Sequence, residues 1–247
     1  MPAPNAGGPA PEAGAMSYRA LEQDYRLLTR PASDVIAWHQ SQPVTCGAFL
    51  ADVSECAKSL PDSPYLVNLC ADRYRFSVAF FAAAINGQTT LLPSQRSIES
   101  IAQLRESYSP CHIIADNPDT HCDSFVDFTP AQNGEGGELS IKPEHIAAIA
   151  FTSGSTGLPS AHPKSWALLC AGRATHARYL QQSADLPENR PTDDSPNNQV
   201  INGLVSTVPS WHMYGLEWAM LLPTVAPVTL FCGPDFFPGD VVTALNN

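Results

Sequence analysis

The hydrophobic residues of this chain fall in short blocks that predict strands and helices in alternation. Short stretches at 65–70, 89–92 and 111–115 are rich in apolar or β-branched residues and predict buried strands, because each is brief and is followed by polar or turn-forming residues. Between these runs, residues 72–86 and 98–108 carry apolar positions at helical spacing. Strand, helix and strand in this order favour an α/β fold with mostly parallel β-sheets flanked by helices.

The downstream part of the pattern keeps the same alternation. Residues 146–151 are apolar and predict a strand that runs into a glycine-rich loop, after which residues 165–182 have helical spacing. Residues 183–198 are hydrophilic and contain several prolines, which predicts an exposed excursion. Beyond it, the pattern predicts a strand at 199–208, a helix at 214–222 and a strand at 227–231.

Composition limits the classes of function. The 247 residues carry a formal net charge of -11 and include only 13 lysines and arginines, so we expect no broad electrostatic binding to nucleic acid or to an anionic membrane. No apolar run approaches the roughly 20 residues of a membrane span. Residues 1–16 are rich in proline, alanine and glycine and lack the features of a secretory signal, so they predict a disordered tail. The seven cysteines are scattered, which favours reduced thiols and a cytoplasmic location.

One pair of dipeptides carries the ligand types of a zinc site. Cys111-His112 and His121-Cys122 have mirror-image order, but their spacing is not that of a known zinc motif. Neighbouring residues of a strand point to opposite faces, so Cys111 and His112 cannot easily hold one ion. We therefore predict no metal site there.

The strongest chemical signal is the loop that follows the apolar run at 146–151. Its two glycines, Gly154 and Gly157, let backbone N–H groups approach an oxyanion closely. The hydroxyl groups interleaved with them add further donors. This composition predicts a cradle for a phosphate group, formed by Thr152, Ser153, Gly154, Ser155, Thr156 and Gly157.

Two better-known loops with glycine and serine do not fit this stretch. A P-loop needs a second glycine five residues after the first, and Pro159 and His162 stand at those places. A nucleophile elbow needs a glycine two residues before its serine, and Ser153 stands before Ser155. The hydroxyls are therefore interpreted as hydrogen-bond donors, and no catalytic nucleophile is assigned.

Residues 151–159, Phe-Thr-Ser-Gly-Ser-Thr-Gly-Leu-Pro, resemble the signature loop of the adenylate-forming superfamily, [YF]-T-S-G-[ST]-T-G-x-P-K-G. This superfamily includes acyl-CoA synthetases, luciferases and peptide-synthetase adenylation domains. The lysine and glycine that usually follow are Ser160 and Ala161 here, and a lysine arrives only at Lys164. A second stretch, Pro-Ser-Trp-His-Met-Tyr-Gly-Leu at 209–216, resembles the family's pattern of proline, an aromatic residue or histidine, and a glycine leading into a helix.

The resemblance implies a set of site residues. The loop residues 152–157 would wrap the β and γ phosphates of ATP with Mg²⁺, and the start of the following helix would add a partial positive charge. Lys164 would contact the phosphates from that helix start, the alternative being a solvated lysine. His212, Tyr214 and Gly215 would shape the acyl pocket or gate it, although a lone histidine there is otherwise typical of a core or a helix start.

The resemblance implies the front part of a larger enzyme. It covers about residues 18–247, so we interpret 17–247 as a partial N-terminal AMP-binding domain, without the remaining C-terminal part and small domain. After Phe231 we find no segments like Y-G-x-T-E or Y-x-T-G-D. The implied function is the N-terminal fragment of an ATP-dependent acyl- or aryl-adenylate-forming ligase, inactive alone, with a small carboxylic acid as substrate and CoA or an acyl carrier protein as acceptor. The ending of the loop points to fatty or aryl acids.

Two alternatives stay open. The first alternative is that the chain is a noncatalytic remnant or a nucleotide-phosphate-binding module, which keeps the fold without ligase activity. A phosphate-binding hydrolase ranks last, because no general base is evident near the loop.

Overall fold

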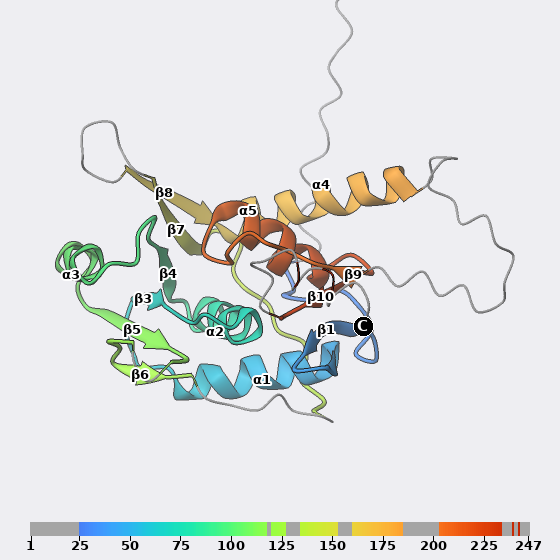
Figure 1. Cartoon of the computed structure of the whole chain (residues 1–247), viewed down its shortest axis with the longest axis horizontal. Coiled ribbons are helices and arrows are strands. Elements are labelled where there is room, and N and C mark those ends of the chain that lie inside the picture. Colours follow the sequence, from blue (N-terminus) through green and yellow to red (C-terminus); the bar gives the residue numbers. More distant parts are fainter. Residues whose placement is uncertain are drawn as a thin grey trace, which may run out of the picture.

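The computed structural model describes residues 25–117, 120–126, 134–152, 160–184 and 203–233, together with Gly239 and Val242. The predicted tail, the centre of the glycine-rich loop (153–157) and most of the predicted excursion at 183–198 lie outside the described residues. The described strands form a six-stranded and a four-stranded sheet (Figure 1).

The six-stranded sheet has the order β6 (Ser124–Phe125), β5 (Cys111–Ala115), β3 (Tyr65–Asn68), β4 (Thr89–Leu92), β7 (Ile146–Thr152) and β8 (Ser160–Ser165). The smaller sheet has the order β2 (Gln42–Thr45), β1 (Val35–His39), β10 (Thr229–Phe231) and β9 (Gly203–Leu204). Neighbouring strands are parallel except at the pairs β7–β8 and β1–β2. The predicted fold class, α/β with mostly parallel sheets flanked by helices, is confirmed.

Helix α2 (Arg73–Ile85) joins β3 to β4 and lies between the two sheets (Figure 1). Asp72 begins it, because its side chain accepts a hydrogen bond from the N–H of Arg75 at 2.9 Å. Gly87 has a φ of 74°, a conformation that residues with a side chain rarely adopt, and it ends the helical run. The predicted helix at 72–86 is therefore confirmed with its end signals.

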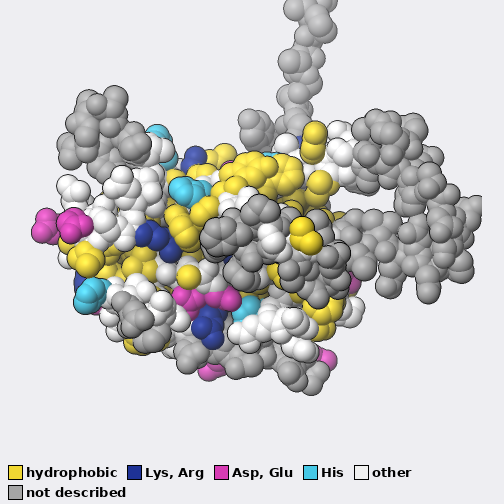
Figure 2. All heavy atoms as spheres, viewed as in Figure 1, with side chains coloured by type: hydrophobic (Ala, Val, Ile, Leu, Met, Phe, Trp, Pro, Cys, Tyr) yellow, Lys and Arg dark blue, Asp and Glu magenta, His cyan; other side chains and the backbone are white. Residues whose placement is uncertain are grey.

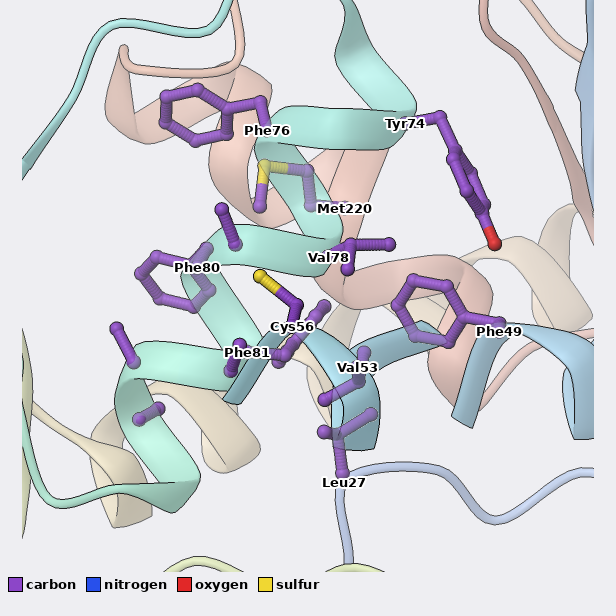
Figure 3. Close-up of a cluster of buried hydrophobic side chains, with 14 of the residues drawn as sticks. Leu27, Phe49, Val53, Cys56, Tyr74, Phe76, Val78, Phe80, Phe81 and Met220 are labelled. Atoms are coloured by element: carbon purple, nitrogen blue, oxygen red, sulfur yellow. The ribbon is translucent and has the colours of Figure 1, made fainter. Parts of the chain in front are cut away.

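The core lies on both faces of α2. Figure 3 shows its aromatic residues Phe76, Phe80 and Phe81 among side chains of other elements. Val53 comes from α1 (Cys46–Ser59), and Met220 comes from a π-helical turn (Leu216–Leu221). Helix α2 is buried nearly all round. The small side chains of its alanines leave room for both sheets to pack against it.

Helix α3 (Ile98–Ser107) covers the opposite face of the six-stranded sheet. Its Ile101 and Leu104 pack on strand residues that include Val67 and Phe151, in a cluster separate from the main core. Helix α4 (Trp166–Ala184) belongs to the main core instead, where Trp166 is fully buried. No helix among the described residues is both long and apolar enough to cross a membrane.

The structure differs from the sequence predictions at several elements. The N-terminal elements β1, β2 and α1 were not predicted. The predicted helix at 214–222 is a short helix α5 (Met213–Gly215), the π-helical turn and a 3₁₀ turn at Leu222–Thr224. Of the predicted strand at 199–208, the described part contains only β9.

Candidate active site at the carboxyl edge of the parallel sheet

The parallel strands β5, β3, β4 and β7 all end at one edge of the sheet. Polar side chains stand at or just after these ends. They are Asp116 after β5, Asn68 at the end of β3, Arg96 after β4 and Thr152 at the end of β7. Open α/β sheets bind ligands at the carboxyl ends of their strands, so this edge is the candidate site.

Thr152 is the first residue of the predicted phosphate cradle, and it is exposed. Its Oγ1 lies 3.2 Å from Nε2 of His162 in β8. Thr152 pairs with Ser160 across the hairpin, so residues 153–159 connect the two strands at the carboxyl edge. Phe151 packs on the α3 face, and Thr152 therefore points to the opposite face, because neighbouring strand residues alternate.

The helix after the loop begins at Trp166, one residue after the predicted start, but this start does not lie beside the loop. Strand β8 intervenes and runs antiparallel to β7, so α4 starts beside the beginning of β7. The first N–H groups of α4 donate to the carbonyls of His145 and Pro143 at 2.8 and 2.9 Å. The loop and the helix start lie at opposite ends of a seven-residue strand, which is roughly 20 Å at the usual strand rise. The prediction that this helix start assists a phosphate is wrong.

The same strand changes the position expected for Lys164. It lies in β8 opposite Ala148, four residues after Ser160 and near the helix end of the strand. Lys164 is therefore about 13 Å along β8 from the loop at the usual strand rise. The helix-start basis for its phosphate contact is wrong, and the contact itself stays a prediction.

Residues 206–215, called the His212 segment, contain the other predicted site residues. His212 is exposed and directly precedes α5. Its N–H donates to the carbonyl of Pro209 at 3.1 Å, and its carbonyl accepts from the N–H of Leu216 at 2.8 Å. A β-carbon on Gly215 would lie 2.1 Å from the carbonyl oxygen of Pro209, so only glycine lets the segment fold this tightly. Tyr214 is 61% exposed and stacks on Trp218.

Two arginines hold the His212 segment against the large sheet. Arg73 of α2 donates to the carbonyl oxygens of Val208, at 2.8 Å, and of Ser206. Arg96 places its guanidinium carbon 3.5 Å from the ring centroid of Trp211. The segment therefore reaches the ends of β3 and β4. Since β7 neighbours β4, the predicted acyl-pocket residues and the predicted phosphate loop share one edge of the sheet.

Carboxylates at this edge are occupied by the protein itself. Asp116 accepts the N–H groups of Ala71 and Asp72 at 2.8 Å each, one on each oxygen. Asp72 accepts from Arg75 and lies 2.9 Å from Nε2 of the buried His39. Burial raises the pKa of Asp72, but these hydrogen bonds outweigh it and leave the pKa below its ordinary value.

The donors at this edge suit an oxyanion. Among the described residues, no group of three or more His, Cys, Asp or Glu side chains could hold a metal ion. His112, one of the weighed zinc ligands, instead lies 2.9 Å from the hydroxyl of Ser124. The hydroxyl of Thr152 and the ring of His162 can donate to a phosphate, so a magnesium ion here would be held largely by the nucleotide's own phosphates.

A cavity of about 500 Å³ opens beside the site, on the α3 face. Its floor is apolar and includes Ile101 and Ile113. Arg96 and Arg105 lie at its rim, with Asp123 paired to Arg105 at 3.2 Å. This cavity combines an apolar floor with a net positive rim, although the whole chain is acidic.

Comparison with solved structures identifies the architecture. The o-succinylbenzoate coenzyme A synthetase of Bacillus subtilis, solved with ATP and magnesium, superimposes with a TM-score of 0.62 over 87% of this chain, at 17% identity. The same enzyme with its acyl-adenylate intermediate gives a TM-score of 0.64 at 18% identity. The chain has the fold of the N-terminal part of adenylate-forming enzymes. MatB from Rhodopseudomonas palustris, in its apo form, gives a TM-score of 0.68 over 90% of this chain at 15% identity.

The adenylate-forming fold is present only in part. The chain spans 57% of the length of the ATP-bound synthetase, 56% of the acyl-adenylate complex and 46% of MatB, which is about half of these relatives. Neither a family model nor a curated protein matches the sequence.

Sequence reasoning missed three side chains of this site. His162 was noted only because it does not fit the P-loop pattern. Its place in the strand β8 was not recognised, because β8 was not predicted. Arg73 and Arg96 were not singled out in the sequence. Their partners are more than a hundred positions away, and no local signal announces such contacts.

Proposed function

We propose that this chain is the triphosphate-binding N-terminal part of an ATP-dependent acyl- or aryl-adenylate-forming ligase. In that reaction a carboxylate oxygen attacks the α-phosphorus of ATP, an acyl-AMP bond forms and pyrophosphate leaves. A thiol of CoA or of an acyl carrier protein then attacks the acyl carbon, and AMP leaves. The observation that carries the proposal is the loop from Thr152, which leaves the parallel sheet at the edge where the His212 segment also lies.

The residues of this chain would bind and orient the two reactants. Donors of the loop residues 152–157 would neutralise charge on the β and γ phosphates, so that pyrophosphate leaves more readily. The hydroxyl of Thr152 and the ring of His162 lie close enough to act on one oxyanion. His212, Tyr214 and Gly215 would border the carboxylic acid, with Gly215 fixing the turn that presents the exposed His212.

Binding without turnover is the expected behaviour of the 247 residues alone. The solved relatives are about twice as long as the part that this chain matches. In-line attack needs the carboxylate and the phosphorus to be held together, and loss of such positioning costs several orders of magnitude in rate. We therefore expect the purified chain to bind Mg-ATP and to give no carboxylate-dependent exchange between pyrophosphate and ATP.

Exchange of labelled pyrophosphate into ATP tests this prediction. A panel of aryl and fatty acids is added to the purified chain, and an intact adenylate-forming enzyme serves as the positive control. Exchange above background that depends on one of the acids would contradict the expected inactivity while supporting the ligase chemistry. Release of phosphate from ATP without any acid would instead favour a hydrolase.

The same assay separates the ligase part from the alternative of a phosphate-binding module. Where the reading frame in the gene continues past Asn247, the protein with the added residues is produced and assayed in the same way. Exchange in the extended protein supports the ligase. A stop codon directly after Asn247, with Mg-ATP binding retained, supports the noncatalytic module.

A further inference from the structure

Arg96 connects the large sheet to the residue that precedes His212. Its Nη2 donates to the carbonyl oxygen of Asn68 at 2.9 Å, and its Nη1 lies 3.5 Å from the carbonyl oxygen of Cys70. The guanidinium also lies over the ring of Trp211, with its central carbon 3.5 Å from the ring centroid. A single planar group therefore joins the end of β3 to the tip of the His212 segment.

The environment of Arg96 strengthens this contact. Burial lowers its pKa to about 10, which still leaves the side chain charged at neutral pH. The centroid of the ring of Phe76, a residue of α2, lies 5.9 Å from the guanidinium carbon of Arg96. A cation over an indole ring is attracted by the electrons of the ring, and the attraction is larger where water is excluded. A flat guanidinium can also stack, which an ammonium group cannot do.

The His212 segment has separate supports at its base and at its tip. Arg73 holds its base through the carbonyl oxygens of Ser206 and Val208. Within the segment, the hydrogen bond from His212 to Pro209 and the close approach at Gly215 make a tight turn. Outside this turn, the contact between Arg96 and Trp211 is a second attachment of the segment to the large sheet, separate from the one that Arg73 makes.

We propose that Arg96 is a positioning residue that holds Trp211 and thereby fixes the direction in which His212 faces the carboxyl edge. The role of His212 toward a carboxylic acid rests on the proposed function, whereas the hold on Trp211 does not. Arg96 follows β4, beside the strand that leads into the phosphate loop. Its hold on Trp211 therefore links the His212 segment to the part of the sheet that leads into the predicted phosphate loop.

Amide hydrogen exchange followed by NMR on the full chain tests this proposal. The informative amides are those of His212 and Leu216, whose hydrogen bonds close the segment. We expect Arg96→Gln to speed their exchange at least tenfold, while the amides of α3 and β3 change less than twofold. Arg96→Lys keeps the positive charge but lacks the planar guanidinium, so it should speed the exchange of these two amides less than Arg96→Gln does. It also provides the test if Arg96→Gln does not fold.

Two further variants serve as controls. Arg105→Gln removes the other arginine of the same cavity, which pairs with Asp123 and not with Trp211, and it should leave both amides within twofold of the parent. Trp211→Leu should reproduce the effect of Arg96→Gln, and combining the two should add little further.

Three results would overturn the proposal. They are unchanged exchange at His212 and Leu216 in Arg96→Gln, an equal effect of Arg105→Gln, or faster exchange spread evenly over the chain. The readout involves no nucleotide, so it is independent of the pyrophosphate exchange assay. If the ligase proposal fails, the role of Arg96 in holding Trp211 is unaffected. If the role of Arg96 fails, the ligase proposal is unaffected.

Discussion

Asp72 serves two parts of the molecule at once. Its carboxylate caps the start of α2 by accepting from the N–H of Arg75, and it also lies 2.9 Å from Nε2 of His39 in the smaller sheet. His39 is 3% exposed and its ring packs against Tyr74, whose hydroxyl donates to Asp52 at 2.6 Å. These contacts join the beginning of α2 to the smaller sheet, close to the candidate site.

The lowered pKa of Asp72 predicts a pH-dependent contribution to stability. A carboxyl whose pKa is lower in the folded state stabilises the fold above its unfolded pKa, near 3.8, and loses that effect as the pH falls through the folded pKa. Asp72→Asn keeps the helix cap but removes the charge facing His39. We expect it to lower the free energy of unfolding by about 1–2 kcal/mol at pH 7.

Thermal unfolding measured from pH 7 down to pH 3 checks this prediction. The difference between the parent and Asp72→Asn should shrink as the pH falls below the unfolded pKa near 3.8 toward the lower folded pKa, where the folded parent also takes up the proton. Asp62→Asn, at an exposed position, is the control and should shift the unfolding temperature little. A difference that stays constant across this range would show that the charge of Asp72 does not act as described.

At the scale of the elements, the β7–β8 hairpin decides the geometry of the site. It turns the glycine-rich stretch into a connection between two strands, and it carries α4 away to the other end of β7. In the proposed function, a phosphate at this loop would be bound by the loop with Thr152 and His162, and the start of α4 would lie too far away to assist. Lys164 lies four residues along β8 from Ser160, so its proposed phosphate contact would need the side chain to reach back toward the loop.

Substitutions along the hairpin should separate these positions. We expect Thr152→Ala to weaken Mg-ATP binding about fivefold, which corresponds to one lost hydrogen bond of roughly 1 kcal/mol. Lys164→Ala should stay within about twofold of the parent, because roughly 13 Å separates the residue from the loop. Titration calorimetry measures both affinities. A tenfold loss in Lys164→Ala together with no loss in Thr152→Ala would require a different path for the loop.

Some elements could be predicted from the sequence because their causes are local. The helix α2 has its cap, its apolar residues and its closing glycine within one stretch, and β4 combines two β-branched threonines with two leucines in a fully buried run that Pro93 ends. By contrast, β8 lies at the sheet edge, where mostly exposed residues such as His162 and Pro163 need no apolar pattern. The phosphate loop was found by composition, whereas Arg96 was not, because its contact with Trp211 joins residues 115 positions apart.

At the scale of the whole molecule, the chain is a partial version of a larger architecture. The face in Figure 2 shows hydrophobic side chains gathered over α4 and the adjoining α5. Large apolar side chains exposed on these elements are Leu168, Tyr179 and Tyr214. The solved relatives continue beyond the matched part for about half of their length. The expected inactivity of the chain in pyrophosphate exchange is a prediction about the whole molecule, because it rests on the half of the relatives' length that this chain does not match.

The central claim is that the hydroxyl-rich loop after β7 binds the triphosphate of ATP. Titration calorimetry with Mg²⁺ and a nonhydrolysable ATP analogue tests it directly, by comparing the parent chain with the double variant Ser155→Ala and Thr156→Ala. Thr175→Ala is the matched control, because it removes an exposed hydroxyl of α4 far along the chain from the loop. We predict that the double variant loses at least about tenfold in affinity, the equivalent of roughly 1.4 kcal/mol, while the control does not change. Equal affinity of the parent and the double variant, or no binding by the parent, would contradict the account.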